Sequence, residues 1–368
     1  MLTSLKLLSS NLGFERGKAL ADALCKNSTL KDLYLYVNNL GSEGEKSLAE
    51  VLCKNSTLTS LYFDNNNLGL KEVKTLADAL CKNSTLTFLD LMEENLGLEG
   101  VKTLADALCK NSTLTSLYLN LGSDGEKGEK ALADALCKNS MLMSLSLQNN
   151  LGSEGGKILA YTLCKNIALT ELNLEENELG SEGEKALADA LCRNSTLIVL
   201  NLDSNGIGSE GGKALADALC RNTMLTSLSL QRNDIRPEGG KALAEALCKN
   251  TTLTSLTLTK LNLDENKLGL REGKALADAL CKNSTLKDLY LYGNNLGSEG
   301  AKALADALSD ALCRNSTLTS LNLEYNYLGS EGGKALADAL CKNSTLIKLD
   351  ISKNNIRFKL TSNNQILK

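Results

Sequence analysis

The feature that most constrains this chain is a repeat of 28 residues. The segment Leu318–Thr345 reads LTSLNLEYNYLGSEGGKALADALCKNST, and near-copies of it begin at Leu30, Leu58 and Leu86 and continue along most of the sequence. Self-similarity at a period of roughly 20 to 50 residues marks an array in which each repeat is one supersecondary unit. The chain is therefore expected to grow in one dimension by stacking repeats on their neighbours.

The first part of each repeat predicts a short strand and a turn. Leu321 and Leu323 alternate in an extended run, so both point to one face of a strand. Asn326 lies where a buried side-chain amide can bond the backbone of the turn.

The second part predicts a helix over Lys334–Lys342, because Leu336, Ala339 and Leu340 share one face. Ser330 is a candidate N-cap, and Asn343 is a candidate left-handed C-cap. Parallel strands would then line the inner side of an arc, with the wider helices outside.

These repeats predict a right-handed α/β horseshoe of about twelve strand–helix units plus a C-terminal partial repeat. We expect residues 1–368 to form a single solenoid, in which 346–368 is the partial repeat or cap. No polar capping unit precedes Leu2, which suggests a fragment of a longer protein.

A few repeats depart from the pattern. Glu94 replaces the turn asparagine of the fourth repeat, the fifth has Gly122 there, and the sixth is one residue short at Asn150. Five extra residues lie between Cys248 and Leu286, so we place the strand motif there at Leu258–Asn266. Because stability adds along an array, the fifth–sixth and tenth–eleventh repeats are the predicted weak joints.

Twelve cysteines recur once per helix, and nine Asn-X-Ser/Thr sequons recur in the helix-to-strand loops. Neighbouring helices pack roughly 8–10 Å apart, which is too far for a disulfide. No CxxC pair or histidine supports a metal site. We interpret both series as consequences of copying one repeat in a reducing, cytoplasmic environment.

Composition disfavours several functions. The net charge of −4 has the wrong sign for nucleic-acid binding, and no run of 18 apolar residues could span a membrane. Without histidine, no Ser/His or Cys/His catalytic set is possible, and the GSEGG segments lack the GK[ST] ending of a phosphate loop. We therefore predict a non-enzymatic chain without metal or cofactor.

The strand residues between the leucines are the candidates for function, because the copies differ most there. Tyrosines are enriched at protein-binding hot spots, and acidic neighbours favour a basic or mixed-charge partner. The alternative is that these side chains are only acceptable solvent-facing strand residues. The predicted protein-binding residues are Tyr34, Tyr36, Tyr62, Asp64, Asp90, Tyr118, Glu175, Asp203, Asp264, Tyr290, Tyr292 and Glu324.

The pattern LxxLxLxxNxLxxxGxxxLAxAL resembles ribonuclease-inhibitor-like leucine-rich repeats. Runs such as ALADALCKNSTLTSLNL are most similar to the repeat region of CARD-containing NOD-like receptors of innate immunity. This resemblance implies a sensing or autoinhibitory region that binds another protein on its concave strand face. Related repeats occur in Ran GTPase-activating proteins, so stimulation of a small Ran-type GTPase is the alternative function.

Overall fold

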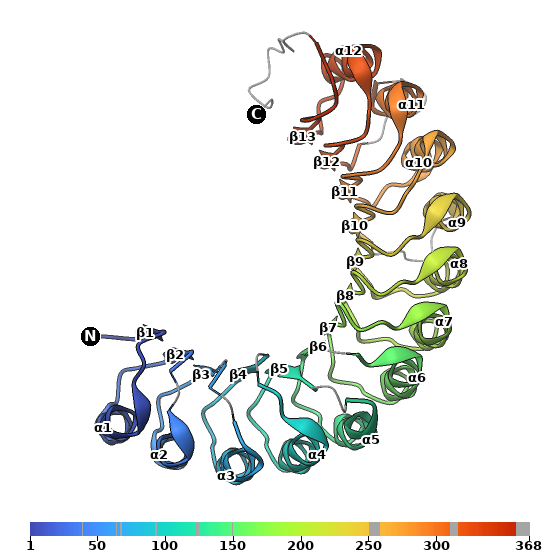
Figure 1. Ribbon diagram of the computed structural model, residues 1–368. Helices are drawn as coiled ribbons and strands as arrows, with labels where there is room; N and C mark the ends of the chain where they lie inside the picture. The colour runs from blue at the N-terminus through green and yellow to red at the C-terminus, as the bar shows by residue number, and fades with distance from the viewer. Residues whose placement is uncertain are drawn as a thin grey trace. The chain divides into compact units, whose positions relative to one another are not determined.

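A computed structural model describes residues 1–38, 40–63, 65–66, 68–92, 94–121, 125–148, 150–249, 258–309 and 316–357, with only the backbone described at 42 and 125–127. Contacts divide the chain into two compact units, Met1–Asn177 (unit 1) and Glu178–Lys368 (unit 2). In each unit strands and helices alternate, with the strands along one side and the helices along the other (Figure 1).

The elements of unit 1 follow in order as β1 (Ser4–Leu8), α1 (Gly13–Lys26), β2 (Asp32–Tyr36), α2 (Gly41–Lys54), β3 (Ser60–Tyr62), α3 (Leu70–Leu80), β4 (Phe88–Leu91), α4 (Gly97–Leu108), β5 (Ser116–Asn120), α5 (Gly125–Leu136), β6 (Ser144–Gln148), α6 (Gly152–Leu163) and β7 (Glu171–Asn173).

Those of unit 2 are α7 (Gly180–Leu191), β8 (Val199–Asn201), α8 (Gly208–Leu219), β9 (Ser227–Ser229), α9 (Arg236–Lys249), β10 (Lys260–Asn262), α10 (Leu270–Lys282), β11 (Asp288–Tyr290), α11 (Gly297–Ser309), β12 (Ser320–Asn322), α12 (Gly329–Leu340) and β13 (Lys348–Asp350).

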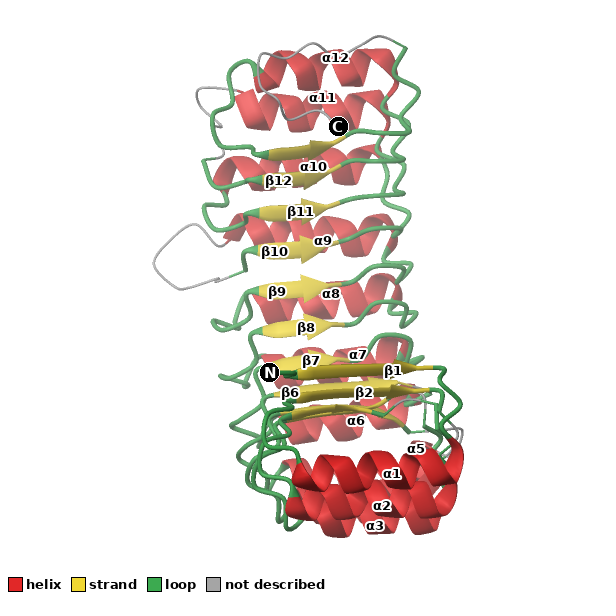
Figure 2. Cartoon of the chain, turned by 90° about the vertical axis from the view of Figure 1, so that its left-hand side faces the viewer, coloured by secondary structure: helices red, strands yellow, loops and turns green. Residues whose placement is uncertain are grey.

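Within each unit, consecutive strands pair in parallel, as the aligned arrows β8 to β12 show (Figure 2). The register keeps the central leucines side by side, from Leu33 with Leu61 in unit 1 to Leu289 with Leu321 in unit 2. These leucines are buried, and burying each one contributes roughly 1.5–3 kcal/mol. The predicted fold class of alternating strand–helix repeats is therefore confirmed.

In most repeats a buried asparagine after the strand links the repeat to its neighbour. In Asn326, Nδ2 donates to the carbonyl oxygen of Leu291 in the preceding repeat at 2.6 Å and to that of Glu324 in its own turn at 3.1 Å. The role predicted for Asn326 is thus confirmed. Glu94 takes the same place in the fourth repeat, where its carboxylate accepts from the backbone N–H groups of Asn66 and of Leu68, the latter at 2.7 Å.

Both predicted helix caps are wrong. Helix α12 begins at Gly329, whose φ of +60° suits glycine, and its N-cap is Leu328, so Ser330 lies inside the helix. Asn343 does not adopt a positive φ. Its side chain instead joins two repeats, because Oδ1 accepts from the N–H of Leu346 at 2.8 Å and Nδ2 donates to the carbonyl of Leu308 at 2.9 Å.

The irregular repeats are partly described. The strand motif placed at Leu258–Asn266 is confirmed, since β10 lies within it and Asn266 is fully buried. Asn150 of the sixth repeat is exposed, unlike Asn326. Gly122, the residues after Ser309 up to 315, and 250–257 lie outside the described residues, as do 358–368 of the predicted cap. The weak joints and the single solenoid stay predictions.

Candidate protein-binding surface

The strand face of unit 1 carries a continuous row of aromatic side chains. Alternation along the short strands turns the leucines into the core and presents the residues between them on the opposite face. Tyr34, Tyr36, Tyr62 and Tyr118 all take such positions and are half-buried. The register sets Tyr34 beside Tyr62, because β2 and β3 pair without offset.

These rings are in direct contact. Tyr34 stacks on Tyr62 with ring centroids 4.1 Å apart and an interplanar angle of 9°. Phe88 continues the contact, with centroids 4.5 Å from Tyr62 and 5.1 Å from Tyr118, and Tyr36 lies 6.1 Å from Tyr34. We call Tyr34, Tyr36, Tyr62, Phe88 and Tyr118 the aromatic row. Contact between rings stiffens the set, since each aromatic pair contributes about 0.5–1.5 kcal/mol beyond area burial.

Phe88 is the member that sequence reasoning missed. It occupies the position of Ser60 and Ser116 in the adjacent strands, with which it is in register. Its signal was an aromatic residue at a position where no other copy has one and where serine is the most frequent residue. Without Phe88, Asp90 would separate Tyr62 from Tyr118, because these three residues follow one another in register across β3, β4 and β5.

The surroundings of the row are negative. Burial raises the pKa of the Tyr62 hydroxyl, and the hydroxyl of Tyr34 and the carboxylate of Asp32 raise it further. Burial also raises the pKa of Tyr118, followed by the charges of Asp90 and Glu171. Among the alternate positions of the described strands β1 to β7, the charged residues are Lys6, Asp32, Asp90 and Glu171, which makes three acids to one base.

Three of the predicted acidic site residues bond to the protein's own backbone. Asp90 is 8% exposed and its Oδ1 accepts from the N–H of Met92 at 3.1 Å. Asp203 accepts from the hydroxyl of Ser229 and the N–H of Gln231, both at 2.7 Å. Asp264 accepts from the N–H of Tyr292 at 2.6 Å, and burial raises its pKa to about 6. These carboxylates shape turns as well as contributing charge.

The remaining predicted residues do not join the aromatic row. Tyr290 and Tyr292 belong to unit 2, where Lys260 Nζ lies 5.4 Å from the ring centroid of Tyr290 and Tyr292 contacts Tyr325 with centroids 6.1 Å apart. Glu324, also in unit 2, pairs with Lys353 at 3.0 Å. Glu175 is half-buried in the turn after β7, and its N–H bonds Asn173. Asp64 lies outside the described residues.

The repeated cysteines and sequons have structural explanations. None of the eleven cysteines in the described part of the chain forms a disulfide with another of them. The sequon asparagines Asn55, Asn83 and Asn111 are buried, and each Nδ2 donates to a leucine carbonyl of the preceding repeat at 2.7–2.8 Å. A glycan on Nδ2 would remove that bond, which supports interpreting these sequons as part of the repeat. Asn250, Asn315 and Cys313 lie outside the described residues.

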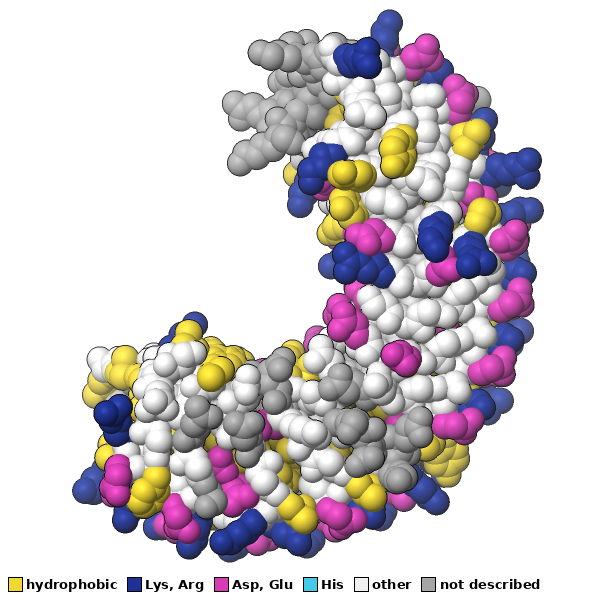
Figure 3. Space-filling model, in the orientation of Figure 1, with side chains coloured by type: hydrophobic (Ala, Val, Ile, Leu, Met, Phe, Trp, Pro, Cys, Tyr) yellow, Lys and Arg dark blue, Asp and Glu magenta, His cyan; other side chains and the backbone are white. Residues whose placement is uncertain are grey.

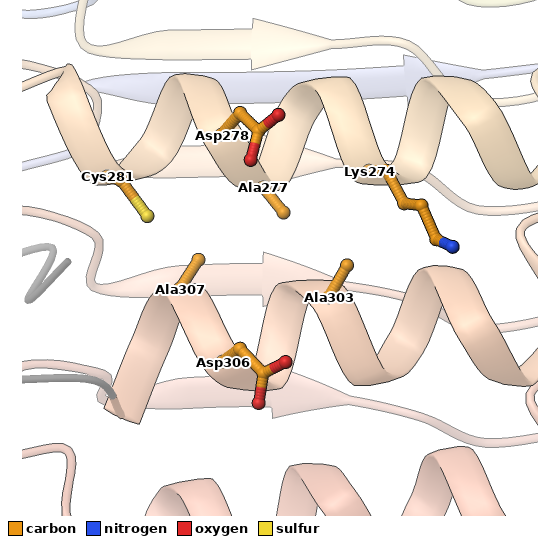
Figure 4. A pocket seen from close by; sticks show the side chains of 7 residues that line it. All are labelled: Lys274, Ala277, Asp278, Cys281, Ala303, Asp306 and Ala307. Atoms are coloured by element: carbon orange, nitrogen blue, oxygen red, sulfur yellow. The ribbon is translucent and has the colours of Figure 1, made fainter.

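Small open grooves lie between helices on the helix side. A groove of about 270 Å³ lies between α10 and α11 (Figure 4), where small side chains of the two helices face each other. Its lining residues are Lys274, Ala277, Asp278, Cys281, Ala303, Asp306 and Ala307. Charged side chains of both signs follow the helix side in Figure 3. The described residues hold no cluster of metal-binding side chains, and none of their helices is long and apolar enough to span a membrane.

Comparison with known proteins agrees with this architecture of strand–helix repeats. A family model described as "Leucine Rich repeat" matches residues 82–105, 165–188, 193–216, 221–244, 282–305, 314–337 and 342–357. These segments are leucine-rich repeats. Such repeats are generally protein–protein interaction modules, and the family is typically a non-enzymatic binding scaffold.

Two solved structures illustrate the likeness. A crystal structure of a TLR13–ssRNA13 complex aligns with a TM-score of 0.52 and 19% identity, covering 89% of this chain and 44% of that chain. This chain thus spans less than half the length of that neighbour, and the likeness shows the fold alone. Actin-binding site 2 of leiomodin-1 aligns with a TM-score of 0.32 and 23% identity, over 37% of this chain and 78% of that chain. No curated protein matches.

Proposed function

We propose that this protein is a non-enzymatic scaffold that binds a partner protein on its strand face. The observation that carries the proposal is the aromatic row of unit 1. Its rings are half-buried, in mutual contact and therefore preorganised, so binding orders few additional side chains. Tyrosine supplies large contact area with a polar tip, which is characteristic of binding hot spots.

The acidic surroundings favour a protein partner with basic or mixed charge over nucleic acid or an anionic membrane surface. Three carboxylates and one lysine on the strands of unit 1 would repel a phosphate backbone. Described cysteines that form no disulfide with one another, and structurally used sequon asparagines, support a reducing, cytoplasmic location. A sensing or regulatory role, as in NOD-like receptors, is the form of scaffold that we propose.

The test is affinity capture from a cytoplasmic extract with three forms of the full chain. The first is the wild type, the second has Tyr34, Tyr36, Tyr62 and Tyr118 of the aromatic row changed to Ala, and the third has exposed Lys18 and Asp22 of α1 changed to Ala. We expect one set of proteins to be retained by the wild type and the α1 variant and lost from the tyrosine variant, with equal circular dichroism. Retention by all three forms would contradict the proposal.

The alternative, stimulation of a Ran-type GTPase, is decided by a separate assay. GTP hydrolysis by such a GTPase is measured with and without the purified chain. The scaffold proposal expects an unchanged rate. A rate that increases with the concentration of the chain would replace it with the GTPase-activating function.

A further inference from the structure

We infer that the Tyr118 end of the aromatic row receives an arginine side chain from an extended, basic segment of the partner. This inference rests on the proposed function and names the chemistry of the partner. The segment would cross the strands of unit 1, and its arginine would stack against Tyr118 and pair with Glu171.

The two ends of the row differ in charge. At the β2 end, Lys6 Nζ already lies 4.6 Å from the ring centroid of Tyr34, so the chain's own lysine occupies the cation position there. At the β5 end, the described ring contact of Tyr118 is with Phe88 on β4. A lysine of the chain itself therefore already contacts the Tyr34 end of the aromatic row, whereas the Tyr118 end is open to a cation from a partner.

The open end has small neighbours. Ser146 on β6 is in register with Tyr118, and Ser144 is in register with Ser116. Serine side chains are too short to cover an adjacent tyrosine, and the described residues place no second aromatic ring on that side of Tyr118. A planar guanidinium can lie against this side of the ring, in the stacking geometry that arginine adopts on aromatic faces.

Two carboxylates, those of Asp90 and Glu171, interact electrostatically with Tyr118. Asp90 is in register with Tyr118 on the β4 side, and Glu171 of β7 is in register with Ser144 on the other. Both charges contribute to the raised pKa of the Tyr118 hydroxyl. Glu171 is exposed, and none of the ion pairs in the described parts of the chain includes it. The site thus combines an uncovered aromatic side with an unneutralised carboxylate, which selects a cation with a flat head.

The size of the row sets the length of the segment. From β2 to β5 there are three strand spacings, or about 14 Å at about 4.8 Å each. An extended peptide rises about 3.3 Å per residue, so about five residues cover the row. The remaining rings would contact apolar or small side chains of the same segment.

The experiment is calorimetric titration of the full chain with three synthetic octapeptides. Each alternates serine with one other residue, which is arginine, lysine or citrulline, the neutral isostere of arginine. We expect the arginine peptide to bind about tenfold more tightly than the lysine peptide, and the citrulline peptide to bind weakest, because stacking and charge both contribute. Equal affinity for arginine and lysine peptides, or no binding of the arginine peptide, would overturn the inference.

Matched variants locate the site. Tyr118→Ala and Glu171→Gln should each weaken arginine-peptide binding about tenfold, while Tyr118→Phe, which keeps the ring, should stay within about threefold. Tyr290→Ala in unit 2 and Lys6→Ala at the occupied end should not weaken it. Tyr290→Ala weakening binding as much as Tyr118→Ala would overturn the inference, as would preferential, Tyr118-dependent binding of oligouridylate, whose bases also stack on aromatic rings.

The two proposals fail differently. If the peptides show no arginine preference but partner capture still depends on the strand-face tyrosines, the arginine inference is wrong and the scaffold proposal stands. If capture and peptide binding are both independent of the tyrosines, both are wrong.

Discussion

The same six residues, KDLYLY, occur at Lys31–Tyr36 in unit 1 and at Lys287–Tyr292 in unit 2. In unit 1, Tyr34 stacks on Tyr62 at 4.1 Å and joins the aromatic row. In unit 2, its counterpart Tyr290 is in register with Asn262 and Asn322, and its described ring contact is with the Lys260 ammonium. The first tyrosine of the same local sequence therefore joins a row of contacting rings in unit 1 but has no described ring–ring contact in unit 2, because the neighbouring repeats differ.

Replacing the asparagines that follow these two strands, Asn38 after β2 and Asn294 after β11, should give the largest difference in stability. Asn294 Nδ2 donates to the carbonyl of Leu263, and Oδ1 accepts from the N–H groups of Asn266 and Leu268 at 3.1 and 3.0 Å. Asn38 Nδ2 donates to Leu7 and Tyr36, but its Oδ1 has no hydrogen-bond partner among the described residues.

Replacing Asn294 by Ala should therefore cost roughly 4 kcal/mol of local stability, and Asn38→Ala roughly 2 kcal/mol, because buried groups lose their partners. Hydrogen exchange followed by mass spectrometry of peptides that cover each turn measures both values. Equal losses at the two sites would show that the Oδ1 bonds contribute nothing.

The helices α2 and α11, which follow the two strands, should differ in how they make the free energy of unfolding depend on pH. Glu45 of α2 has Ala301 at its position in α11. Burial, with the charges of Glu72 and Glu94, raises the pKa of Glu45 to about 7 from 4.5. The folded state therefore holds more protons than the unfolded state between these values, so the free energy of unfolding falls as pH rises from 4.5 through 7.

Glu45→Gln should remove that dependence. The variant should be on the order of 3 kcal/mol more stable than the wild type above pH 8, with the advantage declining towards zero below about pH 4.5. Urea denaturation at pH 4, 6, 7 and 9 tests this, with Ala301→Ser as a variant that should show no added pH dependence. An advantage that is independent of pH would mean that packing, not charge, separates Gln from Glu.

Replacing Tyr34 or Tyr290 should give the smallest difference in the free energy of unfolding. Tyr34→Ala removes a stacked ring from the row, whereas Tyr290→Ala removes no described ring–ring contact, and each loses one lysine–ring contact. The first substitution should cost about 1 kcal/mol more than the second, in keeping with the value of one aromatic pair. Urea denaturation at pH 7 compares them, and the double variant Tyr34→Ala with Tyr62→Ala should cost less than the sum of its single variants. Strict additivity would argue against coupling between the rings.

Much of the fold could be predicted because the same residue pattern recurs many times along the chain. The spacing of Leu321, Leu323 and Asn326 predicted strand, core and turn, and it located the strand at Leu258–Asn266 despite the extra residues before it. The Ser330 cap was mispredicted because α12 already begins at Gly329, and the Asn343 cap was mispredicted because that residue was considered within one repeat. The side chain of Asn343 bonds Leu308 of the preceding repeat, and such bonds are not apparent in a single copy.

The candidate surface was predicted less well, for the same reason. The sequence indicated Tyr34, Tyr62 and Tyr118 but not Phe88, whose value comes from contacting two tyrosines of other repeats. It also grouped Asp90, Asp203 and Asp264 with the exposed acids, although each is largely buried and bonded to backbone.

The sequence by itself determined the period, the strand–helix unit and the residues that face the core, because hydrophobic spacing and turn chemistry act within about ten residues. Only the tertiary structure decided which tyrosines meet, which carboxylates are used by the backbone and where Glu45 acquires its raised pKa. Those properties arise between side chains about 28 residues apart in sequence and one strand spacing apart in space, so they depend on the order in which unlike repeats are stacked.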